Sequence, residues 1–295
     1  MYCFIVNKTS GSGRALKTWD HIKNKLQKKN IPYRVHFTQQ PNHATELVHE
    51  LRRSEEPKAI IAVGGDGTIH EVINGLVGST IPLGIIPAGS GNDFCRGMGI
   101  PLQYDKALER ILKNEQKVID VGRINDTYFA TIVGIGFDGQ VALETHHSKN
   151  KKLLNLAGIG SIPYIINVLK VLLYYKPTNV DLYIDSIKTT HQKVWLIAIA
   201  NSPFYAGGMM ICPDAKNNDQ LFDICIVKGI SRWEFLQIFP SVFKGEHIHH
   251  PSIITLKGKK LKILSSTPLT AHGDGEIIGN TPFKIMISPA SISVL

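Results

Sequence analysis

The stretch AIIAVGGDGTIHEVINGL, Ala59–Leu76, decides the fold of this chain. Its first residues form the short apolar run typical of a buried strand, and a helix is expected from about Ile69. Between them lies GGDGT, Gly64–Thr68, whose glycines allow close approach of the backbone just before the positive end of a helix. Asp66 would repel a phosphate unless a divalent cation lay between them, so the loop predicts a site for a metal–nucleotide complex. The alternative is an ordinary glycine turn in which Asp66 or Thr68 caps the helix.

Two further loops have the same build. Asn7–Gly13 (NKTSGSG) follows the first predicted strand, and Pro87–Asp93 (PAGSGND) ends the predicted strand LGIIP. Because the carboxyl ends of parallel strands share one edge of an open α/β sheet, we expect the three loops to meet where ligands bind. Neither the P-loop pattern nor Gly-x-Gly-x-x-Gly after a strand is present, which argues against a P-loop NTPase and an ordinary dehydrogenase.

Predicted strands and helices alternate over the first 120 residues, which favours a parallel sheet flanked by helices. From about Lys117 the chain turns to β-rich segments such as YFATIVGIGF and VWLIAIAN, with only two good helices, which predicts a mainly antiparallel domain. We therefore expect an α/β domain over residues 1–120 and a β-rich domain over residues 121–283. A closing strand within residues 284–295 could return to either.

The composition is that of a globular protein with an anionic partner. The 295 residues carry a formal net charge of +9, which suits nucleotide phosphates, a nucleic acid or an acidic membrane surface. The many lysines of the first predicted helix lie opposite an apolar face of Leu16, Trp19, Ile22 and Leu26, so we expect no nucleic-acid role for them. Four widely spaced cysteines and an N-terminus without signal-peptide features predict a cytoplasmic protein with reduced thiols.

An apolar stretch, Leu153–Tyr175, is nearly long enough to cross a bilayer. Asn155, Pro163, Asn167 and Lys170 interrupt it, and one lysine near a helix centre costs about 2.5–3.5 kcal/mol on insertion scales. We expect instead a helix from about Ser161 to Tyr175 on or near a surface. With Lys149, Lys151 and Lys152 beside it, this segment predicts peripheral, reversible binding to anionic bilayers.

Four motifs in order resemble the diacylglycerol kinase catalytic-domain family, which includes bacterial diacylglycerol kinases, related lipid kinases, and sphingosine and ceramide kinases. They are GGDGTIHEVINGL (64–76), PAGSGNDF (87–94), GMMICPDAKNND (208–219) and GDGE (273–276). GGDGT alone is shared with NAD kinases and, more loosely, phosphofructokinases. Lys8 stands where the family usually has proline, and Ser90 where it often has threonine. The resemblance implies an α/β nucleotide domain paired with a β-sandwich domain, a C-terminal segment that rejoins the first domain, and a homodimer.

The resemblance also assigns ATP and Mg²⁺ to the N-terminal loops, with Asp66 acting through the magnesium ion. Thr38 enters only through its place after the predicted strand YRVHF. The nucleotide-binding residues that it implies are Asn7, Ser10, Gly11, Thr38, Gly65, Asp66, Gly67, Thr68, Glu71 and Ser90. We expect their loop neighbours Lys8, Thr9, Gly64 and Asn92 to belong to the same site.

The sequence GDGE places two carboxylates, Asp274 and Glu276, around a glycine. The residues by themselves favour a hairpin turn, for which Gly-Asp-Gly is good chemistry. The resemblance adds a catalytic role, because phosphoryl transfer to an alcohol needs a base for the hydroxyl proton. It implies Asp274 as that base and Glu276 as support for the turn or the metal shell, with Glu276 as base the open alternative.

The segment PDAKNNDQLFD, Pro213–Asp223, offers three carboxylates to a hard cation. The resemblance maps a structural metal ion onto Asp219 with the main-chain oxygens of Lys216 and Leu221. A metal-free loop rich in Asp and Asn is the alternative.

These observations predict an ATP-dependent lipid kinase that acts on a hydroxyl, with diacylglycerol as substrate and phosphatidic acid as product. One alternative is an NAD kinase or another small-molecule kinase sharing GGDGT. The other is a catalytically silent lipid-binding regulator, against which the presence of both Asp66 and Asp274 counts.

Overall fold

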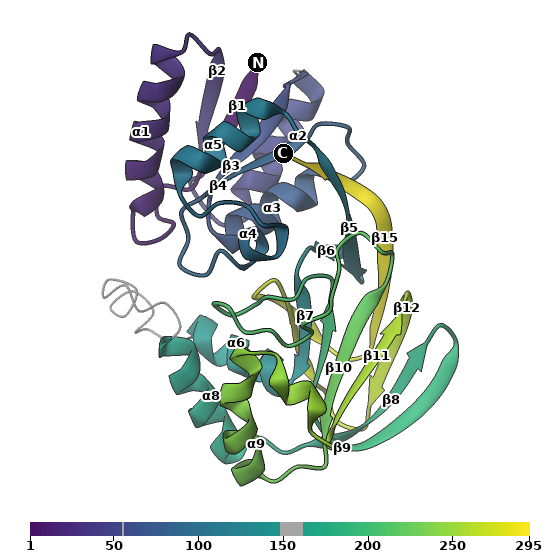
Figure 1. The fold of residues 1–295 in the computed structure, drawn as a ribbon. Coiled ribbons are helices and arrows are strands. Elements are labelled where there is room, and N and C mark those ends of the chain that lie inside the picture. The colour runs from purple at the N-terminus through teal and green to yellow at the C-terminus, as the bar shows by residue number, and fades with distance from the viewer. Residues whose placement is uncertain (55, 148–161) are drawn as a thin grey trace. The chain divides into compact units, whose positions relative to one another are not determined.

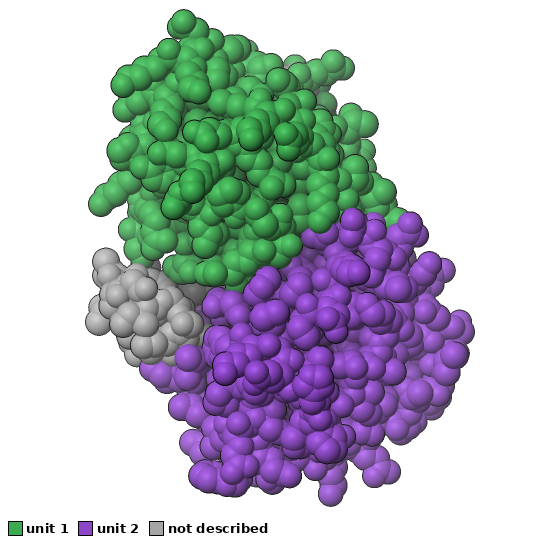
Figure 2. Space-filling model, viewed as in Figure 1, with its two compact units in different colours: residues 1–119, 289–295 green, residues 120–288 purple. Residues whose placement is uncertain are grey.

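The fold is described from a computed structural model over residues 1–54, 56–147 and 162–295 (Figure 1). The chain forms two compact units: residues 1–119 with 289–295 make unit 1, and residues 120–288 make unit 2 (Figure 2).

Unit 1 is an α/β unit with parallel strands, as expected. Its sheet runs β2–β1–β3–β4, and Val63 of β3 lies between Val6 of β1 and Ile86 of β4. Its elements are β1 (Tyr2–Val6), α1 (Arg14–Lys28), β2 (Tyr33–Phe37), α2 (His43–Ser54), β3 (Ala59–Gly64), α3 (Asp66–Leu76), β4 (Leu83–Pro87), α4 (Asp93–Met98) and α5 (Tyr104–Lys113).

The strands of this sheet are apolar because both faces of the sheet are buried. Every residue of β1, β3 and β4 is buried, as in a parallel sheet covered on both faces. Helix α1 buries a stripe that includes Ala15, Trp19, Ile22 and Leu26. The expectation that Leu16 belongs to this stripe was wrong, since Leu16 is exposed. It lies one residue beyond the stripe, about 100° around the helix from Ala15.

Unit 2 is mainly antiparallel and β-rich, as expected. Its strands pair in the order β14–β13–β7–β9–β8–β12–β15, and β10 joins β9 to β11. Its elements are β5 (Lys117–Ile124, which begins in unit 1), β6 (Thr127–Phe129), β7 (Ile132–Gly136), α6 (Phe137–His147), α8 (Ile162–Tyr174), β8 (Thr178–Ile184), β9 (Ile187–Ala200), β10 (Phe222–Lys228), α9 (Arg232–Ile238), the 3₁₀ helices η1 (Phe239–Phe243) and η2 (Glu246–His249), β11 (Ile253–Gly258), β12 (Lys260–Ser265), β13 (Thr270–Gly273), β14 (Glu276–Asn280) and β15 (Phe283–Val294).

Strand β9 separates two apolar cores in unit 2. Ile197 and Ile199 point into a core built largely between strands, whereas Leu196 and Ala198 point to the opposite face. Helices α6, α8 and α9 cover that second face. This alternation explains why VWLIAIA is apolar throughout: both faces of the strand are buried.

Strand β15 belongs to both units. Its first residues pair antiparallel with β12, and its last, Val294, pairs parallel with Leu83 of β4. The amide of Leu295 then donates to the carbonyl of Leu83 at 2.9 Å.

Helix α8 covers most of the helix expected from Ser161 to Tyr175. Residues 153–161, together with Lys149, Lys151 and Lys152, lie outside the described residues. Within the described ranges, no helix is both long and apolar enough to span a membrane.

Candidate functional site

The structure brings the three glycine loops of unit 1 together. A Cβ atom added to Gly89 would lie 2.4 Å from Cα of Gly65, and one added to Gly11 would lie 2.1 Å from the carbonyl oxygen of Ala88. Only glycine permits such backbone approach, so the loops after β1, β3 and β4 form one continuous backbone surface.

Asn7 and Thr68 tie the first loop to the second. Asn7 Nδ2 donates to Thr68 Oγ1 at 3.1 Å, while Asn7 Oδ1 accepts from the amide and the hydroxyl of Thr9. Thr68 Oγ1 lies so close to Gly64 that a Cβ there would be 2.5 Å away. Asn7, Thr9, Gly64 and Thr68 therefore hold the loops in register.

The third loop is shaped by Asn92, which adopts a left-handed conformation at φ 55°. Its Oδ1 accepts from the amide of Gly89 at 2.9 Å, and its Nδ2 donates to the carbonyl of Gly89 at 3.1 Å. Arg14 Nη1, from the start of α1, donates to the same carbonyl at 2.9 Å. Arg14 was not among the expected site residues. A basic residue one position after the SGSG loop was the signal available for it.

Asp66 and Asp93 converge on Gly91. A Cβ added to Gly91 would lie 3.0 Å from Asp66 Oδ2 and 3.1 Å from Asp93 Oδ2. The amide of Phe94 donates to Asp66 Oδ1 at 3.1 Å, and Arg96 lies 3.9 Å from Asp93. Burial, and then the negative charges of Asp66 and Asp93, raise the pKa of the Cys95 thiol, which stays neutral. Two carboxylates beside a glycine are oxygen donors of the kind that Mg²⁺ takes, so these residues fit a hard cation.

Four other expected site residues, Glu71, Thr38, Lys8 and Ser90, differ in their contacts and exposure. Glu71 Oε2 accepts from the amide of Ala44 at 3.0 Å, so this side chain caps the start of α2. The amide of Thr38 donates to the carbonyl of Val6 at 3.0 Å, which places it at the end of β1. The Lys8 ammonium lies 5.2 Å from the centre of the Phe37 ring. In the third loop, Ser90 is exposed.

In unit 2, Asp274 closes the turn between β13 and β14. Its carboxylate accepts from the amides of Ala130 (2.8 Å), Thr131 (2.8 Å) and Ile132 (3.2 Å), and from the Thr131 hydroxyl (2.5 Å). Ala130 and Thr131 form the connection between β6 and β7, and Ile132 begins β7. The sequence had predicted this region as one uninterrupted segment, YFATIVGIGF. Asp274 therefore pins that connection to the hairpin, while Glu276, the first residue of β14, is exposed.

A buried pair that the sequence analysis missed supports the same hairpin. His272 Nε2 lies 3.0 Å from Asp138 Oδ2, and both side chains are buried. The amide of Gly275 donates to His272 Nδ1 at 3.3 Å, so Nδ1 carries no proton and the Nε2–H group donates to Asp138. Asp138 could have been found from sequence: GIGFDGQ repeats the order strand, glycine, aspartate and helix seen at GGDGT.

The segment around Asp219 offers a mixed donor set. Asp219 Oδ1 accepts from the amide of Leu221 at 3.1 Å, and Lys257 Nζ lies 4.0 Å from Asp219 Oδ2 and 2.9 Å from Asp223 Oδ2. No cluster of three or more His, Cys, Asp or Glu side chains is arranged for a metal in the part of the chain that is described. The expected site is of another type, one carboxylate with main-chain oxygens, and that type suits a hard cation.

Known proteins share both halves of this arrangement. A diacylglycerol kinase catalytic domain matches residues 1–124, and a YegS C-terminal NAD kinase β-sandwich-like domain matches residues 131–295. The Bacillus subtilis (strain 168) protein named "Putative lipid kinase YtlR" is 30% identical over 99% of this chain and 98% of its own. The diacylglycerol kinase of that strain is 31% identical over 94% and 90%. The crystal structure of a diacylglycerol kinase from Bacillus anthracis str. Sterne shares the fold, with a TM-score of 0.74 at 22% identity over 99% of this chain and 95% of that one.

Glycine loops of the phosphate-binding kind at the ends of parallel strands, together with a β-sandwich-like second unit, define a kinase of the lipid kinase class. This chain belongs to the diacylglycerol kinase catalytic-domain family. Use of ATP follows from the family.

Proposed function

We propose that this kinase transfers the γ-phosphate of ATP to the free hydroxyl of diacylglycerol, giving phosphatidic acid. The observation that carries the proposal is the match over both units to relatives named diacylglycerol kinase, together with the presence of Asp66, Asp274 and Glu276 in this chain. Because an apolar substrate pocket can be built from many side chains, the family alone does not choose the lipid.

The glycine loops supply the means to hold the triphosphate. Backbone amides of these loops and the N-terminus of α3 favour phosphate oxygens. Mg²⁺ would neutralise phosphate charge, and Asp66 and Asp93 are the residues that would hold it. Asn7, Thr68 and Asn92 keep the loops in place through the hydrogen bonds given above.

The base belongs to the hairpin Gly273–Glu276. Asp274 was our sequence expectation, but its carboxylate already accepts four hydrogen bonds, which stabilise the charged form and weaken it as a base. Glu276 is exposed at the start of β14. We therefore favour the alternative left open by the sequence: Glu276 takes the hydroxyl proton and Asp274 fixes the turn.

Three further expectations stay proposals. The chain binds anionic membrane surfaces reversibly, it forms a homodimer, and it works in the cytoplasm. The net charge of +9 supports the first.

A lipid panel tests the proposed reaction. Purified protein is incubated with labelled ATP and, in separate samples, diacylglycerol, monoacylglycerol, ceramide, sphingosine and NAD. We expect label in phosphatidic acid, and none with Asp66→Asn, whose melting temperature should stay close to that of the unaltered protein. Label on NAD alone would favour the NAD kinase alternative, and no label on any acceptor would favour a silent lipid-binding protein.

A further inference from the structure

The hairpin of β13 and β14 changes register beside His272. Its paired residues are, in order, Thr270 with Asn280, Ala271 with Gly279, His272 with Ile277 and Gly273 with Glu276. Ile278 is therefore an extra residue on β14, as in a β-bulge. Without this shift, Glu276 would belong to the loop rather than to the strand. A shift of one residue also reverses the face to which the following side chains point, so the register at His272 sets the direction of Glu276.

The shift leaves a loop of two residues, Asp274 and Gly275, at φ 52° and 91°. Positive φ at both positions is the pattern of a type I′ turn, and it costs strain at a residue that carries a side chain. Contacts must therefore hold this turn. On one side the Asp274 carboxylate accepts from the amides of residues 130–132. On the other side the amide of Gly275, the residue before Glu276, donates to His272 Nδ1 at 3.3 Å.

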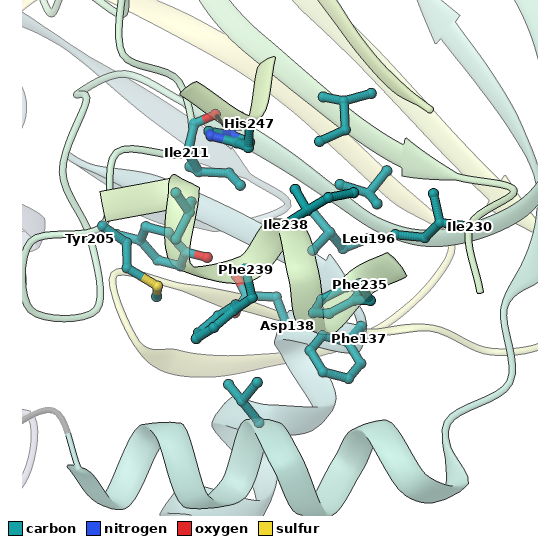
Figure 3. Close-up of a pocket in the computed structure, with 15 residues that line it drawn as sticks. Phe137, Asp138, Leu196, Tyr205, Ile211, Ile230, Phe235, Ile238, Phe239 and His247 are labelled. Atoms are coloured by element: carbon teal, nitrogen blue, oxygen red, sulfur yellow. Dashed lines mark hydrogen bonds between the residues drawn. The ribbon is translucent and has the colours of Figure 1, made fainter. Parts of the chain in front are cut away.

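His272 is itself anchored to helix α6. Its Nε2 lies 3.0 Å from Oδ2 of Asp138, the second residue of that helix, and both side chains are buried. Figure 3 shows Asp138 in the wall of an apolar cavity, beside the rings of Phe137 and Phe239. A hydrogen bond in such surroundings is strong because water does not compete for it. The bond also keeps the ring proton on Nε2, which leaves Nδ1 as the acceptor for the Gly275 amide.

The packing around the pair allows it little freedom. Gly134 of β7 pairs with His272, and a Cβ there would lie 2.1 Å from Asp138 Oδ2 and 2.5 Å from His272 Nε2. A Cβ on Gly139 of α6 would lie 2.0 Å from the carbonyl oxygen of Thr270 in β13. Close packing of this kind holds side chains in one arrangement, so α6 and β7 fix the ring of His272 in place.

We propose that His272 is a positioning residue for Glu276. Through Nε2 it is fixed to α6, and through Nδ1 it holds the turn in the shifted register that directs the Glu276 carboxylate. The inference rests on the proposed function in one respect, that Glu276 takes the hydroxyl proton. A general base works only within hydrogen-bond reach of that proton, so a turn that relaxes its register lowers kcat rather than substrate affinity.

Two substitutions separate the two hydrogen bonds of His272. Asparagine places its side-chain oxygen near the position of Nδ1, whereas glutamine places its side-chain amide near that of Nε2. We expect His272→Asn to keep the Gly275 amide protected from hydrogen exchange, as followed by NMR, and His272→Gln to lose about tenfold of that protection, the upper value of one hydrogen bond. Equal exchange of the Gly275 amide in the two variants would overturn the proposal.

Turnover should follow the same order. With labelled ATP and diacylglycerol, kcat of His272→Gln should be about tenfold below that of His272→Asn, while KM for both substrates changes little in either variant. His191 supplies the matched control, since it is another buried histidine of unit 2, on β9, with Thr189 Oγ1 3.0 Å from its Nε2. Asparagine and glutamine at His191 should give the same Gly275 exchange and the same kcat.

A double variant tests whether His272 acts through Glu276. If it does, His272→Gln should lower kcat in the parent but cause no further loss in the Glu276→Gln background. Losses that multiply in the double variant would show that His272 acts apart from Glu276, and would overturn the proposal.

Hydrogen exchange separates this inference from the proposed function, because it needs neither ATP nor lipid. In a protein that phosphorylates no lipid, protection of the Gly275 amide in His272→Asn and its loss in His272→Gln would keep His272 as the residue that fixes the hairpin and would remove the reaction. A protein that phosphorylates diacylglycerol but exchanges the Gly275 amide equally in both variants would keep the reaction and remove the positioning role.

Discussion

At the residue scale, the two carboxylates of the hairpin differ in what surrounds them. Asp274 lies at φ 52° with four hydrogen-bond donors around its oxygens. Glu276 begins β14 as an exposed side chain. The four residues Gly273–Glu276 thus include one carboxylate that is built into the fold and one that is available to a substrate.

We expect Glu276→Gln to lower kcat by about 10²–10⁴, the usual loss for a general base, with ATP affinity and melting temperature unchanged. Asp274→Asn should instead lower the melting temperature, because an amide NH₂ would face the donors of residues 130–132. Measuring kcat, KM for ATP and thermal melting on both variants checks this. A dead Asp274→Asn enzyme that melts normally, beside an active Glu276→Gln enzyme, would restore Asp274 as the base.

His247 makes stability depend on pH. Burial lowers the pKa of His247, and burial also lowers that of His191. A depressed pKa means that the unfolded chain binds the proton more readily, so stability is full above the unfolded pKa of about 6.5 and falls as pH drops below it. The slope is at most about 1.4 kcal/mol per pH unit for each such histidine, the limit for one bound proton.

We therefore expect the melting temperature to fall between about pH 7.5 and about pH 5.5, and to fall less in His247→Gln. Glutamine keeps a donor for the carbonyl of Ile211 but does not titrate in this range. His249→Gln, at the exposed histidine two residues further on, is the control. Parallel melting curves for His247→Gln and the unaltered protein over this range would contradict the assignment.

At the element scale, local patterns predicted the elements but not the contacts between distant ones. GGDGT predicted the β3–α3 junction because a buried apolar run, glycines and a helix lie in one continuous stretch. The bond of Asp274 to Thr131 joins residues 143 positions apart, and the Asp138–His272 pair joins residues 134 apart. The periodicity of apolar residues along one helix or strand cannot predict such contacts between residues far apart in the sequence. The break between β6 and β7 was missed for the same reason, since its amides are satisfied by the distant hairpin.

The contact between the β3–α3 and β4–α4 loops predicts the effect of Gly89→Ala. The new methyl group would meet backbone at 2.4 Å, and backbone cannot rotate away as a side chain can. We expect ATP affinity to fall at least about tenfold, or 1.4 kcal/mol, as measured by calorimetry. Gly78→Ala is the control: it is strained at φ 75° but has open space, so it should lower the melting temperature and leave ATP affinity intact. Equal ATP affinities in the two variants would contradict the prediction.

The loop before β10 predicts a structural role for a metal ion at Asp219. Asp219→Ala should lower the melting temperature more than it lowers ATP affinity, and a chelator should affect the unaltered protein but not the variant. Positive charge beside this loop could come from a metal ion or from Lys257 of β11, whose Nζ lies 2.9 Å from Asp223 Oδ2. Lys257→Met distinguishes the two. If chelator has no effect and Lys257→Met melts early, lysine rather than a metal ion holds the loop.

At the scale of the whole molecule, charge and exposed apolar groups together predict salt-sensitive membrane binding. Each basic side chain near an anionic surface contributes about 1 kcal/mol, which salt screens. Trp233 of α9 is 69% exposed and Leu173 of α8 is 79% exposed, and insertion of such apolar side chains into a bilayer is insensitive to salt. We expect sedimentation with acidic vesicles to weaken as salt rises, and Trp233→Ser with Leu173→Ser to weaken it at every salt concentration. Ile187→Ser is the matched control, because Ile187 is 71% exposed at the start of β9 and should not contribute. Equal binding to neutral and acidic vesicles at all salt concentrations would rule out the electrostatic contribution. An effect of Ile187→Ser as large as that of the double variant would rule out a specific role for Trp233 and Leu173.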